Sequence, residues 1–336
     1  MGALETIKFY VKNAPTTSGV YQMLDKNGHA LYIGKAKNLK KRLASYVNQK
    51  GLSIRIQKML SQVANIETIT TETEAKALIL EQNLIKKLSP KYNILLKDDK
   101  SFPYLVFTNH PFPRITKERF LEGDKKSGVV FGAFVSGLAL NETISLLQKK
   151  FLLRSCSDNE FKSRTRPCLE YQINRCSAPC VGKISEEEYG DLLKDAIQFL
   201  KKDSDIKRHE AGLTSSENID VFGFYREDDH VCIYVCFYRE GQHFGGKAFF
   251  PKNTAGFSDK EIMRDFIIQF YQDNIPVKLL LVNTEPLEKD VLSDALAEIS
   301  GVKVSIKKPL RGKKLNLVNE TVENAIQSVQ NIESSK

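Results

Sequence analysis

Two tyrosines and a block of positive charge lie close together near the N-terminus. The apolar runs 19–21 and 31–34 carry Tyr21 and Tyr32, and the intervening Asn-Gly pair at 27–28 is a strong signal for a β-hairpin. Five cations follow within eight residues: Lys35, Lys37, Lys40, Lys41 and Arg42. A tyrosine, an ammonium and a guanidinium at one strand end make a pocket suited to a phosphate group. The pattern therefore predicts phosphate binding or phosphate chemistry at the end of this hairpin.

Further polar residues could complete such a site. Arg42 lies on the helix expected after the hairpin, and Tyr46 follows one turn later. Glu81 lies among leucines and isoleucine in ALILEQNLI, so we expect a partly buried carboxylate that needs a cation or a metal ion. Asn93 lies between apolar residues in PKYNILL. Taken singly, each is typical of a sheet, a helix face or a core; only the combination indicates a site.

A second group of chemically capable residues is the set of cysteines. Four fall in the spacing C-x11-C-x7-C-x3-C, with arginines and lysines around them: Cys156, Cys168, Cys176 and Cys180. Without a signal peptide, disulfides are not expected, and four clustered thiols indicate a metal centre. The spacing fits neither paired CxxC zinc sites nor the usual ferredoxin run, so iron–sulfur, zinc and free thiols all stay open. Cys232 and Cys236 lie on one expected strand and are interpreted as core residues.

The composition indicates the class of partner. Of 336 residues, 41% are apolar and 27% are charged, which is typical of a soluble multidomain protein. The net charge of +9 favours an anionic partner, nucleic acid first. No apolar run has membrane-spanning length, and the N-terminal MGALETIKFYVKN carries charges rather than a secretory signal. We therefore expect a cytoplasmic protein with no membrane partner.

The elements that must position these residues form five segments, which we expect at 1–97, 98–150, 151–203, 204–218 and 219–336. The first contains the hairpin, helices at 39–47 and 53–63, a strand at 67–70, and a helix at 71–88 that Thr73 can cap and Pro90 ends. The second contains connecting strands at 104–108 and 114–120 and an amphipathic helix at 141–151. The third is a helical cysteine module, and the fourth is interpreted as a linker.

Helix and strand signals continue to the C-terminus. Ser185 and Glu188 predict a capping box at the start of a helix that ends near residue 202. From residue 219 onward, the order β-β-β-α-β-α-β-α predicts a mixed sheet covered by helices. The fold class is thus α+β and multidomain.

Together, these residues resemble those of a known nuclease family. The paired GVY and YIG motifs, followed by Arg42, Glu81 and Asn93, resemble the GIY-YIG nuclease domain. The longer phrases YIGKAKNLKKRLASY, EAKALILEQNLIKKLSPKYNI and RCSAPCVG resemble the UvrC excinuclease family. This resemblance covers the first 203 residues well and continues more loosely to about residue 330. The first segment would then be an α/β nuclease domain.

The resemblance implies a role for each matching residue. Tyr21 and Tyr32 match the two motif tyrosines, Lys35 the lysine after YIG, Arg42 the helix arginine, Tyr46 the tyrosine after it, and Asn93 the late asparagine. Glu81 matches the metal-binding glutamate, which implies one Mg²⁺ or Mn²⁺ ion. Tyr32 would act as the base, and we expect the cations near it to favour its anion. The four cysteines match the family set that holds a 4Fe–4S cluster, with zinc as the alternative.

The resemblance also implies partners and a reaction. It predicts an endonuclease that makes a single incision 3′ to a lesion in damaged double-stranded DNA, loaded by UvrB from a UvrA–UvrB complex. The segment between residues 202 and 219 is too short for the family's UvrB-docking hairpin, and the chain stops where a second nuclease would begin. We therefore expect an N-terminal half of UvrC, as in the shorter homologue Cho.

The last segment is expected to bind DNA without cutting it. Its strand order indicates an RNase H-like fold, but Asp220 lies at the strand edge and no acidic cluster follows. A basic stretch near its end suits a phosphate backbone: Lys307, Lys308, Arg311, Lys313 and Lys314. Lys37 and Lys41 of the first segment are further candidate DNA contacts. A solvated loop is the alternative for the basic stretch.

Two other functions compete with the repair nuclease. A non-cleaving accessory protein could use the cysteine and basic modules to bind DNA damage, but it would not need the tyrosine, arginine and glutamate set. A GIY-YIG nuclease of mobile-element or restriction type would not explain the four cysteines.

Overall fold

The computed structural model describes residues 3–48, 53–96, 102–119, 128–132, 134, 137–211, 217–239 and 241–333. The chain forms two compact units. The first contains Met1–Asp99, Phe222–Tyr234 and Ala248–Lys336, and the second contains Lys100–Val221 and Val235–Lys247.

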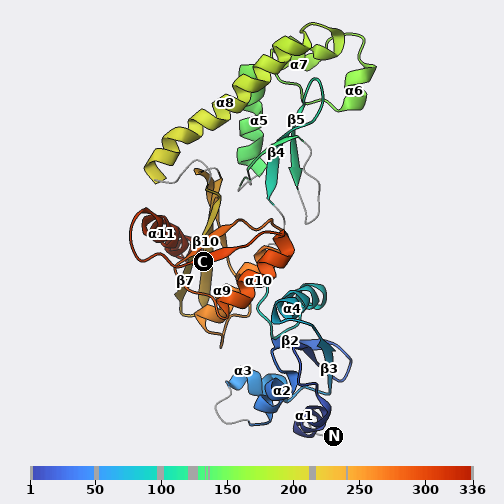
Figure 1. Cartoon of the computed structure of the whole chain (residues 1–336), viewed down its shortest axis with the longest axis vertical. Coiled ribbons are helices and arrows are strands. Elements are labelled where there is room, and N and C mark those ends of the chain that lie inside the picture. The colour runs from blue at the N-terminus through green and yellow to red at the C-terminus, as the bar shows by residue number, and fades with distance from the viewer. Residues whose placement is uncertain are drawn as a thin grey trace. The chain divides into compact units, whose positions relative to one another are not determined.

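The N-terminal domain is a small antiparallel sheet covered by helices (Figure 1). Its elements are α1 (Ala3–Asn13), β1 (Gly19–Leu24), β2 (Ala30–Ala36), α2 (Leu39–Val47), α3 (Ile54–Leu60), β3 (Asn65–Thr70) and α4 (Glu74–Leu88). The sheet order is β2-β1-β3, and both pairings are antiparallel. The predicted hairpin is confirmed, whereas helix α1 was not predicted.

Local signals explain where the helices of this domain begin. Asn38 caps α2 by accepting a hydrogen bond from the Lys41 amide, and Thr73 caps α4 by accepting one from the Lys76 amide. Helix α2 buries Leu39, Leu43 and Tyr46 on one face. Helix α4 packs on β1 and β2. The central strand β1 is buried along its whole length, so the motif tyrosine that it carries is held in the core.

The middle domain joins a three-stranded sheet to a helical module. Its elements are β4 (Pro103–Phe107), β5 (Ile115–Arg119), β6 (Val129–Phe131), α5 (Gly137–Phe151), α6 (Asp158–Ser163), α7 (Leu169–Gln172), the 3-10 turn η1 (Pro179–Val181) and α8 (Glu186–Ala211). The sheet order is β5-β4-β6. The predicted capping box is present, because the Ser185 amide donates to Glu188 and the Glu188 amide donates back. Helix α8 runs to Ala211 and occupies much of the segment that was predicted to be a linker.

The C-terminal domain follows the predicted order of elements. These are β7 (Ile219–Glu227), β8 (His230–Arg239), β9 (Gln242–Phe249), α9 (Asp259–Phe270), β10 (Leu279–Val282), α10 (Lys289–Ser300), β11 (Ser305–Lys307) and α11 (Lys313–Glu333). The sheet order is β11-β10-β7-β8-β9, with β10 and β11 parallel. The sheet is therefore mixed, as expected. Within the described residues, no helix is long and apolar enough to cross a membrane.

Candidate active site

Three of the predicted site residues form one hydrogen-bonded group at the end of the hairpin. The hydroxyls of Tyr21 and Tyr46 share a hydrogen bond of 2.7 Å. Arg42 donates from Nε to the Tyr21 hydroxyl at 3.2 Å, and its guanidinium lies 5.2 Å from the centre of the Tyr46 ring. Both tyrosines are buried, whereas Arg42 stays exposed to solvent. The group therefore fixes the arginine while leaving its remaining donors available to a ligand.

The glycine of the second motif makes room for this aromatic group. A Cβ atom on Gly34 would lie 2.4 Å from the Tyr21 hydroxyl and 2.9 Å from a ring carbon of Tyr32. Any larger residue would displace both rings. In this packing the centres of the Tyr21 and Tyr32 rings lie 6.1 Å apart.

The environment of Tyr32 differs from the sequence-based expectation. Burial raises the pKa of Tyr32 well above its usual value, and Tyr21 and Glu81 raise it further, while Arg42 opposes this only in part. Burial thus outweighs the effect of Arg42 on this pKa and opposes the expected tyrosinate. The cations expected to favour the tyrosinate include the metal ion at Glu81, so the role of Tyr32 as the base stays a prediction.

Glu81 is the buried carboxylate that the sequence predicted, with 4% of its surface exposed. The amide of Lys35 donates to its Oε1 at 2.6 Å, and Nε2 of Gln82 donates to its Oε2 at 3.1 Å. Burial raises the pKa of Glu81 to about 7, and the nearby Arg264 guanidinium and Lys35 limit the rise. The carboxylate is thus aimed at the end of β2, where Lys35 follows Gly34.

Gln82 was not predicted as part of the site. It is fully buried, and its Oε1 has no hydrogen-bond partner among the described residues. An amide oxygen without a partner beside a carboxylate is a ligand type that hard cations or their bound water accept. The signal available in the sequence was a glutamine that follows Glu81 within an apolar stretch.

Asn93 holds the strand that carries the site. Its Oδ1 accepts from the Ile33 amide at 2.9 Å, and its Nδ2 donates to the Ile33 carbonyl at 2.7 Å. The side chain therefore acts as an extra strand partner of β2. Because both ends of the amide are occupied, this geometry gives Asn93 a positioning role.

Lys35 is also in the site, but a partner far along the chain pairs with it. Its ammonium lies 2.6 Å from Oε2 of Glu288, and only 5% of its side chain is exposed. Arg264 contacts the same Glu288 oxygen at 3.3 Å and pairs with Asp265 at 2.7 Å. These three residues were not predicted from the sequence, because no local pattern links α9 and α10 to the hairpin.

The predicted DNA-binding cations lie on the surface. Lys37 and Lys41 are exposed, and Lys37 lies 3.6 Å from Glu74. The C-terminal basic residues run from the end of β11 to the first turn of α11, where no acidic residue is present, and all except the half-buried Lys314 are exposed: Lys307, Lys308, Arg311, Lys313 and Lys314. Their contact with DNA stays a prediction.

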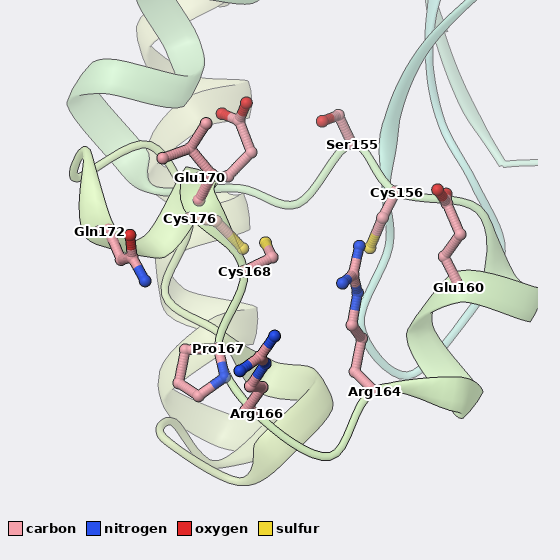
Figure 2. Close-up of a pocket in the computed structure, with 11 residues that line it drawn as sticks. Ser155, Cys156, Glu160, Arg164, Arg166, Pro167, Cys168, Glu170, Gln172 and Cys176 are labelled. Carbon is pink, nitrogen blue, oxygen red and sulfur yellow. The ribbon is translucent and has the colours of Figure 1, made fainter.

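Three of the four clustered cysteines line one pocket of about 740 Å³ in the middle domain (Figure 2). The sulfurs of Cys168 and Cys176 point toward each other, and the Cys156 sulfur faces them across the pocket. Burial raises the pKa of Cys176 to about 11, and the other three cysteines add to the rise. Cys180 follows in η1. The module thus gathers the thiols, with Arg164 and Arg166 beside them.

A buried arginine shapes this module. Arg154 is 1% exposed; it donates to the Cys156 carbonyl at 3.1 Å and pairs with Asp158 at 2.6 Å. It therefore holds the loop that carries Cys156, rather than presenting charge to a ligand. Cys232 and Cys236 are buried in β8, as predicted.

Neither candidate centre is a ready-made site for a single metal ion with several protein ligands. Among the described residues, no group of three or more histidine, cysteine, aspartate or glutamate side chains is placed to hold one ion. A site with one carboxylate, completed by water and phosphate, is compatible with that finding at Glu81. In the C-terminal domain, Asp220 is buried and pairs with Arg239 at 2.6 Å. The arginine therefore already balances the charge of this carboxylate.

Comparison with known families covers nearly the whole chain. Residues 17–94 match the UvrC-like GIY-YIG domain, residues 102–199 the middle domain of the UvrC/Cho excinucleases, and residues 218–331 the UvrC ribonuclease H-like domain. The three matches follow the three domains of the fold.

Individual relatives agree with these matches. The chain is 40% identical over 358 residues to UvrABC system protein C of Paramagnetospirillum magneticum, covering 96% of this chain and 57% of that protein. It is 41% identical over 357 residues to the Rhizobium etli protein of the same name, covering 96% and 52%. The chain thus spans about half the length of these relatives. It is also 43% identical to the magnesium-bound GIY-YIG N-terminal endonuclease domain of UvrC from Thermotoga maritima, covering 26% of this chain and 97% of that one, with a TM-score of 0.25.

Proposed function

This chain belongs to the UvrC/Cho excinuclease family, and we propose that it is a metal-dependent DNA endonuclease of nucleotide excision repair. It makes one incision 3′ to a lesion in double-stranded DNA, after a UvrA–UvrB complex has loaded it. The observation that carries this proposal is the convergence of Arg42, Tyr21, Tyr46 and Glu81 at the end of β2, within the region that matches the GIY-YIG model.

The chain's own residues supply most of the chemistry. Arg42, fixed by Tyr21 and Tyr46, donates to the non-bridging oxygens of the scissile phosphate, where charge develops in the transition state. Lys35 adds a point charge to the same phosphate. Tyr32 can act as the base only as its phenolate, so its own proton must be lost before its phenolic oxygen accepts one from the attacking water. Burial, which raises the pKa of Tyr32, opposes that loss, whereas Arg42 favours it.

Glu81 is the residue that would hold a divalent cation, Mg²⁺ or Mn²⁺. The donor set fits such an ion, because a buried carboxylate and the unpartnered oxygen of Gln82 are both hard oxygen ligands. When bound, the ion stabilises charge on the phosphate and on the leaving oxygen. Asn93 keeps β2, and with it Lys35, in register with Glu81.

The proposal is tested with an end-labelled duplex that carries one lesion. We expect one labelled product from a cut 3′ to the lesion, only when Mg²⁺ or Mn²⁺ is present. We also expect the lesion-specific cut to need UvrA and UvrB, although the docking hairpin predicted to be missing would weaken or alter contact with UvrB. Equal lesion-specific cutting without UvrB would contradict the loading step. No product under any condition would favour a non-cleaving damage-binding role.

We further propose that Cys156, Cys168, Cys176 and Cys180 hold a 4Fe–4S cluster. The support is the donor set: four thiols in one module, three of which line a single pocket. Zinc is the alternative. The cationic Arg164 and Arg166 beside the pocket would bring the module close to a DNA backbone.

Substitution of single cysteines distinguishes these possibilities. The purified protein should be brown, or become brown after anaerobic reconstitution. Cys168→Ser and Cys176→Ser should each lose most of the visible absorbance, because each removes one thiolate ligand. Cys232→Ser is the matched control: that thiol lies in the core of β8, so the colour should remain. A colourless protein with one stoichiometric zinc ion would replace iron–sulfur with zinc.

A further inference from the structure

Helices of the C-terminal domain lie against the part of the N-terminal domain that bears the nuclease site. Both α9 and α10 pack on α4, within the first compact unit. Polar contacts join them: Lys86 lies 2.6 Å from Asp273, and the Gln269 side chain bonds the backbone of Ile94 and Leu96. The contact is therefore specific and places α9 and α10 next to the helix that carries Glu81.

In this contact, the carboxylate of Glu288 forms an ion pair with Lys35, the lysine of the nuclease site. Oε2 of Glu288 lies 2.6 Å from the Lys35 ammonium, which has little remaining exposure to water. Lysine ammonium groups bind carboxylate and phosphate oxygens in the same way, as a point charge. Lys35 therefore cannot bind a DNA phosphate at full strength until Glu288 leaves it.

The backbone at Glu288 indicates that formation of helix α10 does not require a glutamate at this position. Glu288 is the N-cap of α10, has a φ of 51°, and makes no side-chain capping hydrogen bond. This left-handed conformation favours glycine or asparagine, and the N-cap position favours serine, aspartate or asparagine. The glutamate satisfies neither preference, and its side chain instead reaches Lys35. A strained residue that is used for a contact is typical of a functional position.

We infer that Glu288 is an internal competitor of the DNA phosphate at Lys35, and that the C-terminal domain thereby holds the nuclease site in a closed form. The inference rests on the proposed nuclease function. Binding of DNA exchanges the Glu288 carboxylate for a phosphate oxygen. Glu288 is not left without a partner, because Arg264 lies 3.3 Å from the same oxygen and 40% of the Glu288 side chain already meets solvent. Closure thus restrains the nuclease in the absence of DNA.

The matched variants Glu288→Gln and Glu285→Gln test this inference in the full chain. Both remove one negative charge from the connection between β10 and α10, but Glu285 pairs with Lys289 at 3.3 Å on the surface, away from Lys35 among the described residues. Affinity is measured by fluorescence anisotropy on a short labelled duplex in EDTA, so that no cutting is needed. If the closed form dominates, removing the competitor raises the binding-competent fraction. We expect Glu288→Gln to bind about five-fold or more tightly than Glu285→Gln.

Hydrogen exchange gives a second measurement that does not depend on DNA or on activity. In the free protein, amides of residues 286–290 and 33–36 should exchange faster in Glu288→Gln than in Glu285→Gln. If Glu288→Gln does not fold, Glu288→Asn replaces it, since asparagine tolerates the left-handed backbone. Equal affinity and equal exchange in the two variants, or weaker binding by Glu288→Gln, would overturn the inference. If neither the wild type nor the variants cut DNA, the proposed function would be refuted but this inference would not. The affinity and hydrogen-exchange measurements both proceed without cleavage.

Discussion

Replacement of Glu81 by glutamine should lower the rate of DNA cleavage by roughly three orders of magnitude or more, and should leave DNA affinity nearly unchanged. A catalytic metal ion contributes several kcal/mol of charge stabilisation, and each ~1.4 kcal/mol is tenfold in rate. Glutamine keeps an oxygen that accepts the Lys35 amide, which Glu81 accepts at 2.6 Å, so β2 should stay in place. What is lost is the anionic ligand that we propose for the metal ion.

Three measurements check this result. Single-turnover cleavage in Mg²⁺ and in Mn²⁺ gives the rate, calorimetric titration with Mn²⁺ gives metal affinity, and fluorescence anisotropy gives DNA affinity. Glu72→Gln is the control. Glu72 is an exposed acid that lies just before α4 and pairs with Lys76 of that helix. That variant should cut at the normal rate. Normal cleavage by Glu81→Gln would eliminate a mechanism with one metal ion on this carboxylate.

Features with local signals were predicted from the sequence. The hairpin follows from Asn27-Gly28, and the start of α4 follows from Thr73, whose side chain accepts the Lys76 amide. The capping box of Ser185 and Glu188 is equally local. The burial of Glu81 followed from its apolar neighbours in the chain. Such features depend on residues a few positions apart, so composition and spacing are sufficient to find them.

Features that depend on tertiary contacts were not predicted. The pairing of Lys35 with Glu288 joins segments that no periodicity connects. Asn93 was expected in the catalytic group, but its amide bonds the backbone of Ile33. The raised pKa of Tyr32 depends on burial and on the charges of Glu81 and Asp265, which come from different helices. Sequence alone could identify these site residues through the family, but not how their polar groups are already occupied.

Arg42→Ala should lower the rate of the chemical step by about two to three orders of magnitude, as loss of a preorganised donor to a developing oxyanion does. The structure favours a transition-state role because two contacts fix the guanidinium of Arg42. Its Nε donates to Tyr21, and its guanidinium lies over Tyr46. Tyr21 and Tyr46 keep their own 2.7 Å hydrogen bond without the arginine, so the aromatic group should survive the substitution. DNA affinity should change little.

Arg42→Lys separates geometry from charge. Lysine keeps the positive charge but lacks the planar fork that can bind two phosphate oxygens at once. We therefore expect its rate to lie much closer to that of Arg42→Ala than to that of the wild type. Lys41→Ala is the control on the same helix, because Lys41 is exposed and is predicted to contact the DNA backbone rather than to act in the site. Its rate at saturating protein should be normal.

Joint replacement of Lys307, Lys308, Lys313 and Lys314 by alanine gives the opposite pattern. These side chains are expected to contact the backbone of DNA from the segment around β11 and α11. Their loss should weaken binding to all sequences and flatten its dependence on salt, by up to about one unit of slope per lost contact. An Arg42 variant that lost affinity but kept its saturated rate would turn the arginine into a binding residue. The transition-state charge would then be left to Lys35, which the structure pairs with Glu288.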